Sequence, residues 1–71
     1  MSYLGQLLTV WTPVDSSVLR SVGYNGSTLA IEFQNGRVYE HPHVPYEVYH
    51  GLLSADSKGA FYNHYIRGKY K

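Results

Sequence analysis

The sequence contains no cysteine, which excludes disulfide bonds and metal sites built on thiolates. It also lacks any run near the roughly 20 apolar residues that a membrane-spanning helix needs. No basic residue precedes the first apolar stretch, which makes the start of the chain a poor secretory signal. We therefore expect a soluble, cytoplasmic protein with no membrane partner.

Short length is a second constraint, because a domain of 71 residues has a thin core. A chain of this size buries only about 60% of the surface that it exposes when unfolded. Without disulfides, its stability has to come from dense packing, a histidine-bound metal or self-association.

Acidic residues are absent after Asp56, although the net charge of the whole chain is only +1. Lys58, Arg67, Lys69 and Lys71 all follow that aspartate. A basic C-terminal end suits an anionic partner, although terminal lysines can also serve only to keep a chain soluble. Tyrosine is abundant, with eight residues, and it is frequent both in small cores and on binding surfaces.

Three runs of strand-forming residues predict an antiparallel β-meander. They span residues 18–24, 28–33 and 37–41, and they are separated by Asn25-Gly26 and Asn35-Gly36. Asn-Gly favours tight hairpin turns, because both residues tolerate a positive φ.

The register of the second hairpin has two alternatives that differ by one residue. A loop with Gly36 at a bulge places Tyr39 beside Ile31 and His41 beside Leu29. A two-residue turn shifts the pairing and sets a glutamate against Ile31 on the core side. We favour the bulge, because it keeps this carboxylate out of the core.

Two short helices are expected after the strands. Pro45 suits the first position of a helix, and Asp56 or Ser57 can cap the next one. The expected fold is therefore α+β with the order β-β-β-α-α, in which the two helices pack on one face of the sheet. The apolar helix faces contain Pro45, Val48, Tyr49, Leu52 and Leu53, and then Phe61, Tyr62, Tyr65 and Ile66.

Residues 1–15 show no clear periodicity, and we treat them as an N-terminal extension of a domain at residues 16–71. The extension either docks on this domain or forms an exposed apolar patch. Because exposed patches mark interfaces, it is a candidate arm for homo-oligomerisation. Its apolar side chains are Leu4, Leu7, Leu8 and Trp11.

With these elements in place, residues 16–70 resemble the KTSC domain, a small module named after the C-terminus of some lysyl-tRNA synthetases. His41 departs from the family pattern, since an aromatic residue is usual there. The resemblance implies a module that occurs alone or appended to other proteins, and its link to a tRNA-handling enzyme suggests contact with RNA. The matching motifs, in order, are Ser16-Ser17, Gly23-Tyr24, Phe33 with Gly36 and Tyr39, Val44-Pro45, then Ala55, Ser57, Gly59, Asn63 and Ile66-Arg67.

Three histidines suggest a metal-dependent hydrolase as one alternative. His41, His43 and His50 could supply three imidazoles to zinc and leave a fourth position for water. Two prolines interrupt this segment, and no carboxylate follows at a spacing that suggests a general base. We therefore expect no metal and no cofactor, and we interpret residues 40–51 as the junction between the last strand and the first helix.

No residues form a convincing catalytic set. No serine stands in a pattern with a base and an orienting acid. Glu32 and Glu40 lie on neighbouring predicted strands, but without the apolar pocket that paired catalytic carboxylates need. We predict no catalytic residue and no enzyme.

The predicted ligand-binding site lies along the second helix. Free N–H groups at a helix N-terminus suit phosphate, and Gly59 would let a ligand approach the backbone closely. Asn63 and Arg67 share one helical face, and nearby tyrosines can stack on bases. Alternatively, these residues only maintain the fold, with Ser57 as a cap and Arg67 paired with a carboxylate. The predicted contacts are Ser57, Lys58, Gly59, Asn63, Arg67, Lys69, Tyr24, Tyr62 and Tyr70.

The sequence thus predicts a small non-catalytic module that binds an anionic ligand, such as RNA, single-stranded DNA or a nucleotide. The alternative is a protein-interaction or self-association module with no role in nucleic-acid binding. The two functions are compatible, because an oligomer can frame a nucleotide site between its subunits.

Overall fold

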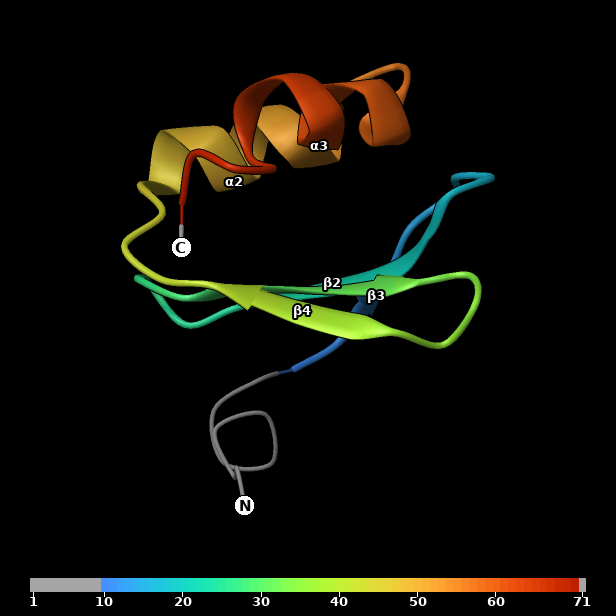
Figure 1. The fold of residues 1–71 in the computed structure, drawn as a ribbon, viewed down its shortest axis with the longest axis horizontal. Coiled ribbons are helices and arrows are strands. Elements are labelled where there is room, and N and C mark those ends of the chain that lie inside the picture. The colour runs from blue at the N-terminus through green and yellow to red at the C-terminus, as the bar shows by residue number, and fades with distance from the viewer. Residues whose placement is uncertain (1–9, 71) are drawn as a thin grey trace.

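The protein has an α+β fold in which two helices pack on one face of an antiparallel sheet (Figure 1). The computed structural model describes residues 10–70. Within that part of the chain, the strand order is β1-β2-β3-β4, which places each strand beside its neighbour in sequence. The elements are β1 (Thr12–Pro13), β2 (Leu19–Tyr24), β3 (Leu29–Phe33), β4 (Val38–His41), α2 (Tyr46–Ser54) and α3 (Lys58–Tyr65).

Strand β1 corrects the prediction of a three-stranded sheet, because the described residues form four strands. Thr12 pairs with Val22 and Pro13 pairs with Ser21, which extends the sheet beside β2. A two-residue strand has no periodicity to detect, and proline is tolerated there because an edge strand need not donate on its outer side. Outside the described residues lie the other apolar residues of the predicted extension, Leu4, Leu7 and Leu8.

The first hairpin turn forms where Asn25-Gly26 predicted it. The Oδ1 atom of Asn25 accepts hydrogen bonds from the backbone N–H groups of Ser27 at 2.9 Å and Thr28 at 2.7 Å. Gly26 has a φ of 97°, in the left-handed region that favours glycine. The side chain of Asn25 therefore closes the loop between β2 and β3.

The second hairpin has the bulged register that the sequence favoured. Tyr39 pairs with Ile31 and His41 pairs with Leu29, while Gly36 at the turn has a φ of 90°. Since alternate residues of a strand share a face, Tyr39 and His41 lie on the same side of the sheet as the core. This register decides which β4 side chains face the helices.

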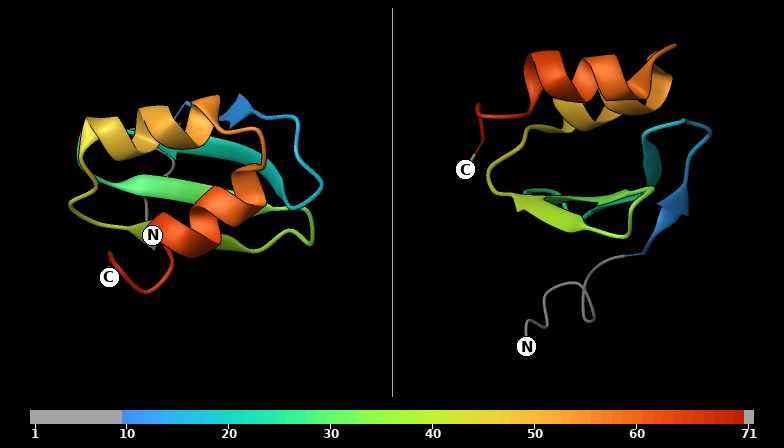
Figure 2. Two further views of the ribbon diagram at one scale, coloured as in Figure 1. Left: turned by 90° about the horizontal axis from the view of Figure 1, so that it is seen from above. Right: turned by 45° about the vertical axis from the view of Figure 1, so that its right-hand side comes forward.

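The core lies between the sheet and the two helices, which both cover one sheet face (Figure 2). Two residues assigned to apolar helix faces, Pro45 and Tyr65, are instead exposed. Pro45 precedes α2, and the ring of Tyr65 packs against Phe61 with 4.7 Å between centroids. The buried core cluster is Leu19, Val22, Leu29, Ile31, Val44, Leu52, Tyr62 and Ile66.

The helix starts agree closely with the prediction. Helix α2 begins at Tyr46, one residue after the predicted start, with Pro45 as the N-cap. Ser57 caps α3, because its Oγ atom accepts a hydrogen bond from the Ala60 N–H at 3.3 Å. No helix in the described part of the chain is long and apolar enough to cross a membrane.

Candidate functional site

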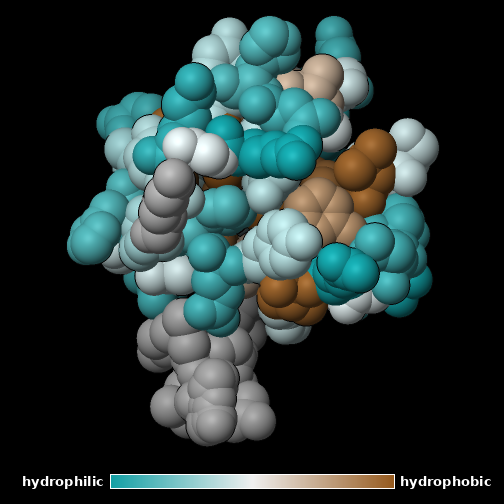
Figure 3. Space-filling model, in the orientation of Figure 1, coloured by the Kyte–Doolittle hydropathy of each residue, from teal (hydrophilic) through white to brown (hydrophobic). Residues whose placement is uncertain are grey.

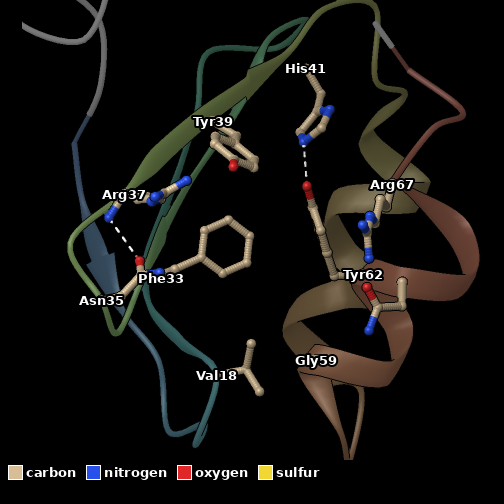
Figure 4. A pocket seen from close by; sticks show the side chains of 10 residues that line it. Val18, Phe33, Asn35, Arg37, Tyr39, His41, Gly59, Tyr62 and Arg67 are labelled. Atoms are coloured by element: carbon tan, nitrogen blue, oxygen red, sulfur yellow. Dashed lines mark hydrogen bonds between the residues drawn. The ribbon is translucent and has the colours of Figure 1, made fainter.

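A cavity of about 400 Å³ lies between the β3–β4 hairpin and α3 (Figure 4). In the space-filling view, apolar surface is exposed on the side of the molecule where the β3–β4 turn lies, between this turn and the helices (Figure 3). We call this space the hairpin cavity. Its lining residues are Val18, Phe33, Asn35, Arg37, Tyr39, His41, Gly59, Tyr62, Asn63 and Arg67.

The sheet side of the hairpin cavity combines a guanidinium with an open aromatic ring. The Oδ1 atom of Asn35 accepts a hydrogen bond from the backbone N–H of Arg37 at 3.0 Å, which fixes the turn from which Arg37 projects. Tyr39 is 47% exposed, and its ring meets Phe33 edge-on with 5.4 Å between centroids. This wall therefore offers a ring face to a planar ligand and a cation to an anion.

The helix side of the cavity carries a second guanidinium. Asn63 lies on α3 and Arg67 lies in the turn that follows the helix; both are exposed, whereas Tyr62 is buried beside them. Figure 4 shows Arg37 and Arg67 on opposite walls of the cavity. Among residues 10–70, no carboxylate lines this space, and its two arginines therefore make it electropositive.

A hydrogen-bonded histidine also lines the cavity. His41 is buried, and its Nδ1 atom lies 2.8 Å from the carbonyl oxygen of Tyr70. A carbonyl can only accept, and Nδ1 therefore carries the proton. The Nε2 atom then accepts a hydrogen bond from the Tyr62 hydroxyl at 2.9 Å. Both ring nitrogens of His41 are therefore hydrogen-bonded within the fold.

Replacing His41 with phenylalanine is expected to lower the free energy of unfolding by about 1–3 kcal/mol, because the Tyr62 hydroxyl is left buried without an acceptor. Adding Tyr62→Phe removes that hydroxyl and should restore part of the loss. Urea unfolding of the two single variants and the double variant measures this coupling. Additive losses would contradict the proposed hydrogen bond.

The structure divides the predicted binding residues between two cavities. Tyr62, Asn63 and Arg67 line the hairpin cavity, whereas Ser57 and Lys58 line a second space of about 240 Å³. The second cavity also contains two aspartates, and we call it the acidic cavity. The ammonium group of Lys58 donates to the carbonyl oxygen of Ala55 at 3.0 Å. An anion at this end of α3 would therefore meet carboxylates and a lysine that is already bonded. The residues lining the acidic cavity are Asp15, Ser16, Ser17, Val18, Asp56, Ser57, Lys58 and Gly59.

Gly59 lines both cavities. The sequence predicted that a ligand would approach its backbone closely, but in the structure its close neighbour is the side chain of Val18. A Cβ atom at Gly59 would lie 3.0 Å from a methyl group of Val18. Gly59→Ala is therefore expected to destabilise the fold by up to about 1 kcal/mol, because the half-exposed Val18 must shift while alanine regains some helix propensity. Thermal unfolding tests this, and Gly59→Ala with Val18→Ala should regain part of the stability. A Gly59→Ala variant as stable as the parent would show that this contact relaxes freely.

The remaining predicted contacts lie outside the hairpin cavity. Tyr24 stacks on Tyr49 with 4.5 Å between ring centroids, and its hydroxyl donates to the carbonyl oxygen of Val44 at 2.6 Å. Tyr70 packs against the core, and Lys69 is exposed in the turn after α3. Tyr24 and Tyr70 therefore serve the fold in this structure, and Lys69 does not line the cavity.

The three histidines do not gather into a metal site. Within residues 10–70, no group of three or more histidine and carboxylate side chains could hold a metal ion. His43 lies at the corner between β4 and α2 with a φ of 59°, and His50 packs against Tyr46 on α2. Both ring nitrogens of His41 are already hydrogen-bonded. This arrangement offers no support for the hydrolase alternative.

Sequence reasoning missed the sheet wall of the site, which consists of Phe33, Asn35, Arg37 and Tyr39. The favoured register had already placed Tyr39 on the core side of β4. That register was therefore the signal that could have drawn attention to the hairpin. The position of α3 opposite it was not available from a local pattern.

Two tyrosines make the stability of the fold depend on pH in the alkaline range. Burial raises the pKa of Tyr62 above its ordinary value, the positive charge of Arg67 lowers it, and Tyr39 raises it further. Burial and, to a smaller extent, the Glu47 carboxylate raise the pKa of Tyr24. The folded state thus holds both phenol protons more tightly than the unfolded state does.

The melting temperature is therefore expected to fall above about pH 10, where unfolded tyrosine ionises. Each of the two phenols stabilises the folded state fully at any pH below the pKa that it has in the unfolded chain. This stabilisation is lost as the pH rises through the higher pKa that it has in the folded protein. Differential scanning fluorimetry across this range tests the effect. Tyr62→Phe should flatten the decline, whereas Tyr65→Phe at an exposed position is the matched control. Parallel pH profiles for the two variants would contradict the assignment to Tyr62.

Comparisons with known proteins give one consistent result. The family model described as the KTSC domain matches residues 15–70. The structure is similar to the crystal structure of a KTSC domain protein from Yersinia pestis, with a TM-score of 0.83 and 34% sequence identity. That match covers 89% of this chain and 92% of the Yersinia chain.

Sequence relatives include both small and large proteins. The chain is 36% identical over 61 residues to a protein from Tsukamurella paurometabola, and the match covers 83% of this chain and 91% of the relative. It is 42% identical over 59 residues to a lysine–tRNA ligase from Nostoc punctiforme. That second match covers 80% of this chain but spans only 10% of the ligase.

Proposed function

The chain belongs to the KTSC domain family, and from this premise we propose that it is a small non-catalytic module that binds an anionic ligand. The ligand classes that fit are RNA, single-stranded DNA and nucleotides. The proposed site is the hairpin cavity between the β3–β4 hairpin and α3.

One observation carries this proposal: two arginines line a cavity that has an exposed aromatic ring and, among residues 10–70, no carboxylate. Arg37 and Arg67 supply guanidinium groups, which suit phosphate because they donate several hydrogen bonds in a fixed plane. Tyr39 supplies a ring on which a base can stack. Cations and aromatic rings are the two components of sites that bind single-stranded nucleic acids.

The chemistry of the lining residues supports binding over catalysis. Paired carboxylates are missing from the described lining, and the only histidine there uses both ring nitrogens in hydrogen bonds. Among the described residues, no serine lines the cavity, and tyrosine provides the only hydroxyl groups there. These features support a ligand that is held without being chemically altered.

The ligase relatives support a link to RNA. A lysine–tRNA ligase from Nostoc punctiforme contains a segment similar to this chain, and so does one from Trichormus variabilis. The segment makes up 10% of each ligase. We therefore take from these relatives only an association with an RNA-handling protein, and not the ligase activity.

Titration with labelled single-stranded RNA and DNA, and calorimetry with nucleotides, tests the proposal at low salt. Binding is expected, and its affinity should fall as salt rises. For single strands the slope of log K against log salt is about −0.7 for each phosphate contact, which gives about −1.4 for two arginine contacts. An uncharged peptide nucleic acid of the same base sequence is the control. If none of the three ligand classes binds at low salt, the proposal fails.

A second candidate function is self-association, which the exposed apolar residues beside β1 favour. Val10 is 81% exposed and Trp11 is 38% exposed. Multi-angle light scattering should then show a dimer or larger species that the Val10→Ser/Trp11→Ser variant converts to a monomer. A parent protein that is monomeric at high concentration would rule out this function.

A further inference from the structure

The size of the hairpin cavity limits the length of the ligand. A volume of about 400 Å³ falls near the lower end of the range of about 300–1,000 Å³ for small-molecule sites. Domains that bind single-stranded nucleic acid along a groove cover about 4–16 nucleotides. The hairpin cavity instead has room for about one nucleotide.

The surroundings of the cavity also oppose a continuous strand. The acidic cavity adjoins the hairpin cavity, since both are lined by Val18 and Gly59. Asp15 and Asp56 line that neighbouring space. A strand that left the hairpin cavity in this direction would bring its next phosphate toward two carboxylates, which repel it. The sign of the charge therefore changes at the boundary between the two cavities.

The charge on the walls matches a terminal phosphate better than an internal one. A phosphomonoester carries about −1.5 to −2 charges at pH 7, whereas each phosphodiester within a strand carries one. Arg37 and Arg67 provide two positive charges, and no lining carboxylate within residues 10–70 offsets them. Tyr39, on the wall opposite Arg67, provides an exposed ring for the base.

On the basis of the proposed function, we infer that the hairpin cavity binds a single nucleotide that carries a terminal phosphate, either free or at the end of an RNA or DNA strand. The base lies against Tyr39, and the phosphate is attracted by the guanidinium groups on the two walls of the cavity. The phosphomonoester contributes to the selectivity because charge-assisted hydrogen bonds are about twice as strong as neutral ones.

Calorimetry with AMP, adenosine and matched oligonucleotides tests this inference. The oligonucleotides have phosphorylated or free ends, at the 5′ or the 3′ position, and two different lengths. AMP, or strands with a terminal phosphate, should bind at least about tenfold more tightly than the same compounds without it. Affinity should not rise with strand length. Binding of AMP alone identifies the source as a free nucleotide, and binding of phosphorylated strands identifies it as a strand end.

A variant pair tests the role of the base. Tyr39→Leu should weaken AMP binding about tenfold while inorganic phosphate binding is unchanged, because only the base stacks on this ring. Tyr65→Leu, at an exposed tyrosine on α3 outside the cavity, is the matched control and should change neither.

Two results would overturn the inference, and they differ in what they leave standing. If strands with free ends bind as tightly as phosphorylated ones and affinity rises with length, the site accommodates an extended strand, and only the single-nucleotide inference fails. If no nucleotide or oligonucleotide binds, the proposed function fails with it.

Discussion

The Arg37→Gln/Arg67→Gln double variant is expected to bind single-stranded RNA and nucleotides about 100-fold more weakly than the parent protein at low salt. Each substitution removes a charge-assisted hydrogen bond to phosphate, worth about 1.5–3 kcal/mol, or at least about tenfold in affinity. Glutamine keeps a polar side chain of similar length. The slope of log K against log salt should also become shallower by about 1.4.

Arg20→Gln is the matched control for this prediction. Arg20 is exposed on β2, its guanidinium donates to the carbonyl oxygen of Gln34 at 3.2 Å, and it does not line the hairpin cavity. Its replacement removes one positive charge, as each single Arg37→Gln or Arg67→Gln substitution does, and it should weaken binding less than either of them. Equal losses at all three positions would mean that overall charge, and not the cavity, determines binding.

Leu52→Ala is expected to lower the free energy of unfolding by about 2–5 kcal/mol. Leu52 is fully buried in the core cluster between the sheet and α2, so the substitution leaves a cavity as well as losing apolar burial. A chain of this length has a total stability of about 4–10 kcal/mol. The variant should therefore be partly or largely unfolded in mild urea, where the parent protein stays folded.

Leu53→Ala provides the control on the same helix. Leu53 is the next residue of α2 and is only partly buried against the core, which should make its truncation less destabilising. Urea unfolding followed by circular dichroism measures both variants. Equal losses at Leu52 and Leu53 would show that the structure places the wrong side of α2 against the sheet.

Much of the fold follows from short-range chemistry. Asn25 and Asn35 mark the two hairpin turns, because each is followed by a glycine that adopts a positive φ. Ser57 marks the start of α3, since its hydroxyl can cap a free N–H group. The hairpin register follows from keeping a carboxylate out of the core.

The missed strand shows the limit of periodicity. Thr12 and Pro13 join the sheet through backbone pairing with β2, and two residues cannot show the alternation that identifies a strand. Tyr65 shows the converse error. Its spacing fits the apolar face of α3, yet the helix ends there and leaves the ring 58% exposed.

The candidate site was only half predictable, because it is formed by two elements that meet in space. The four-residue spacing of Asn63 and Arg67 predicted a shared helical face; α3 ends at Tyr65, so Arg67 lies in the following turn, yet both residues line the cavity. Arg37 and Tyr39 belong to a hairpin more than twenty residues earlier, and only the packing of α3 over that hairpin brings them to the same cavity. Gly59 has an ordinary packing role as well, since its open side faces Val18.

An NMR titration of the nitrogen-labelled protein with AMP and with a short single-stranded RNA tests the location of the site most directly. The largest chemical-shift changes are expected at the backbone amides of Arg37, Tyr39, Asn63 and Arg67. Changes confined to Ser57 and Lys58 at the N-terminal end of α3, or shifts spread evenly over the surface, would contradict the assignment of the hairpin cavity as the binding site.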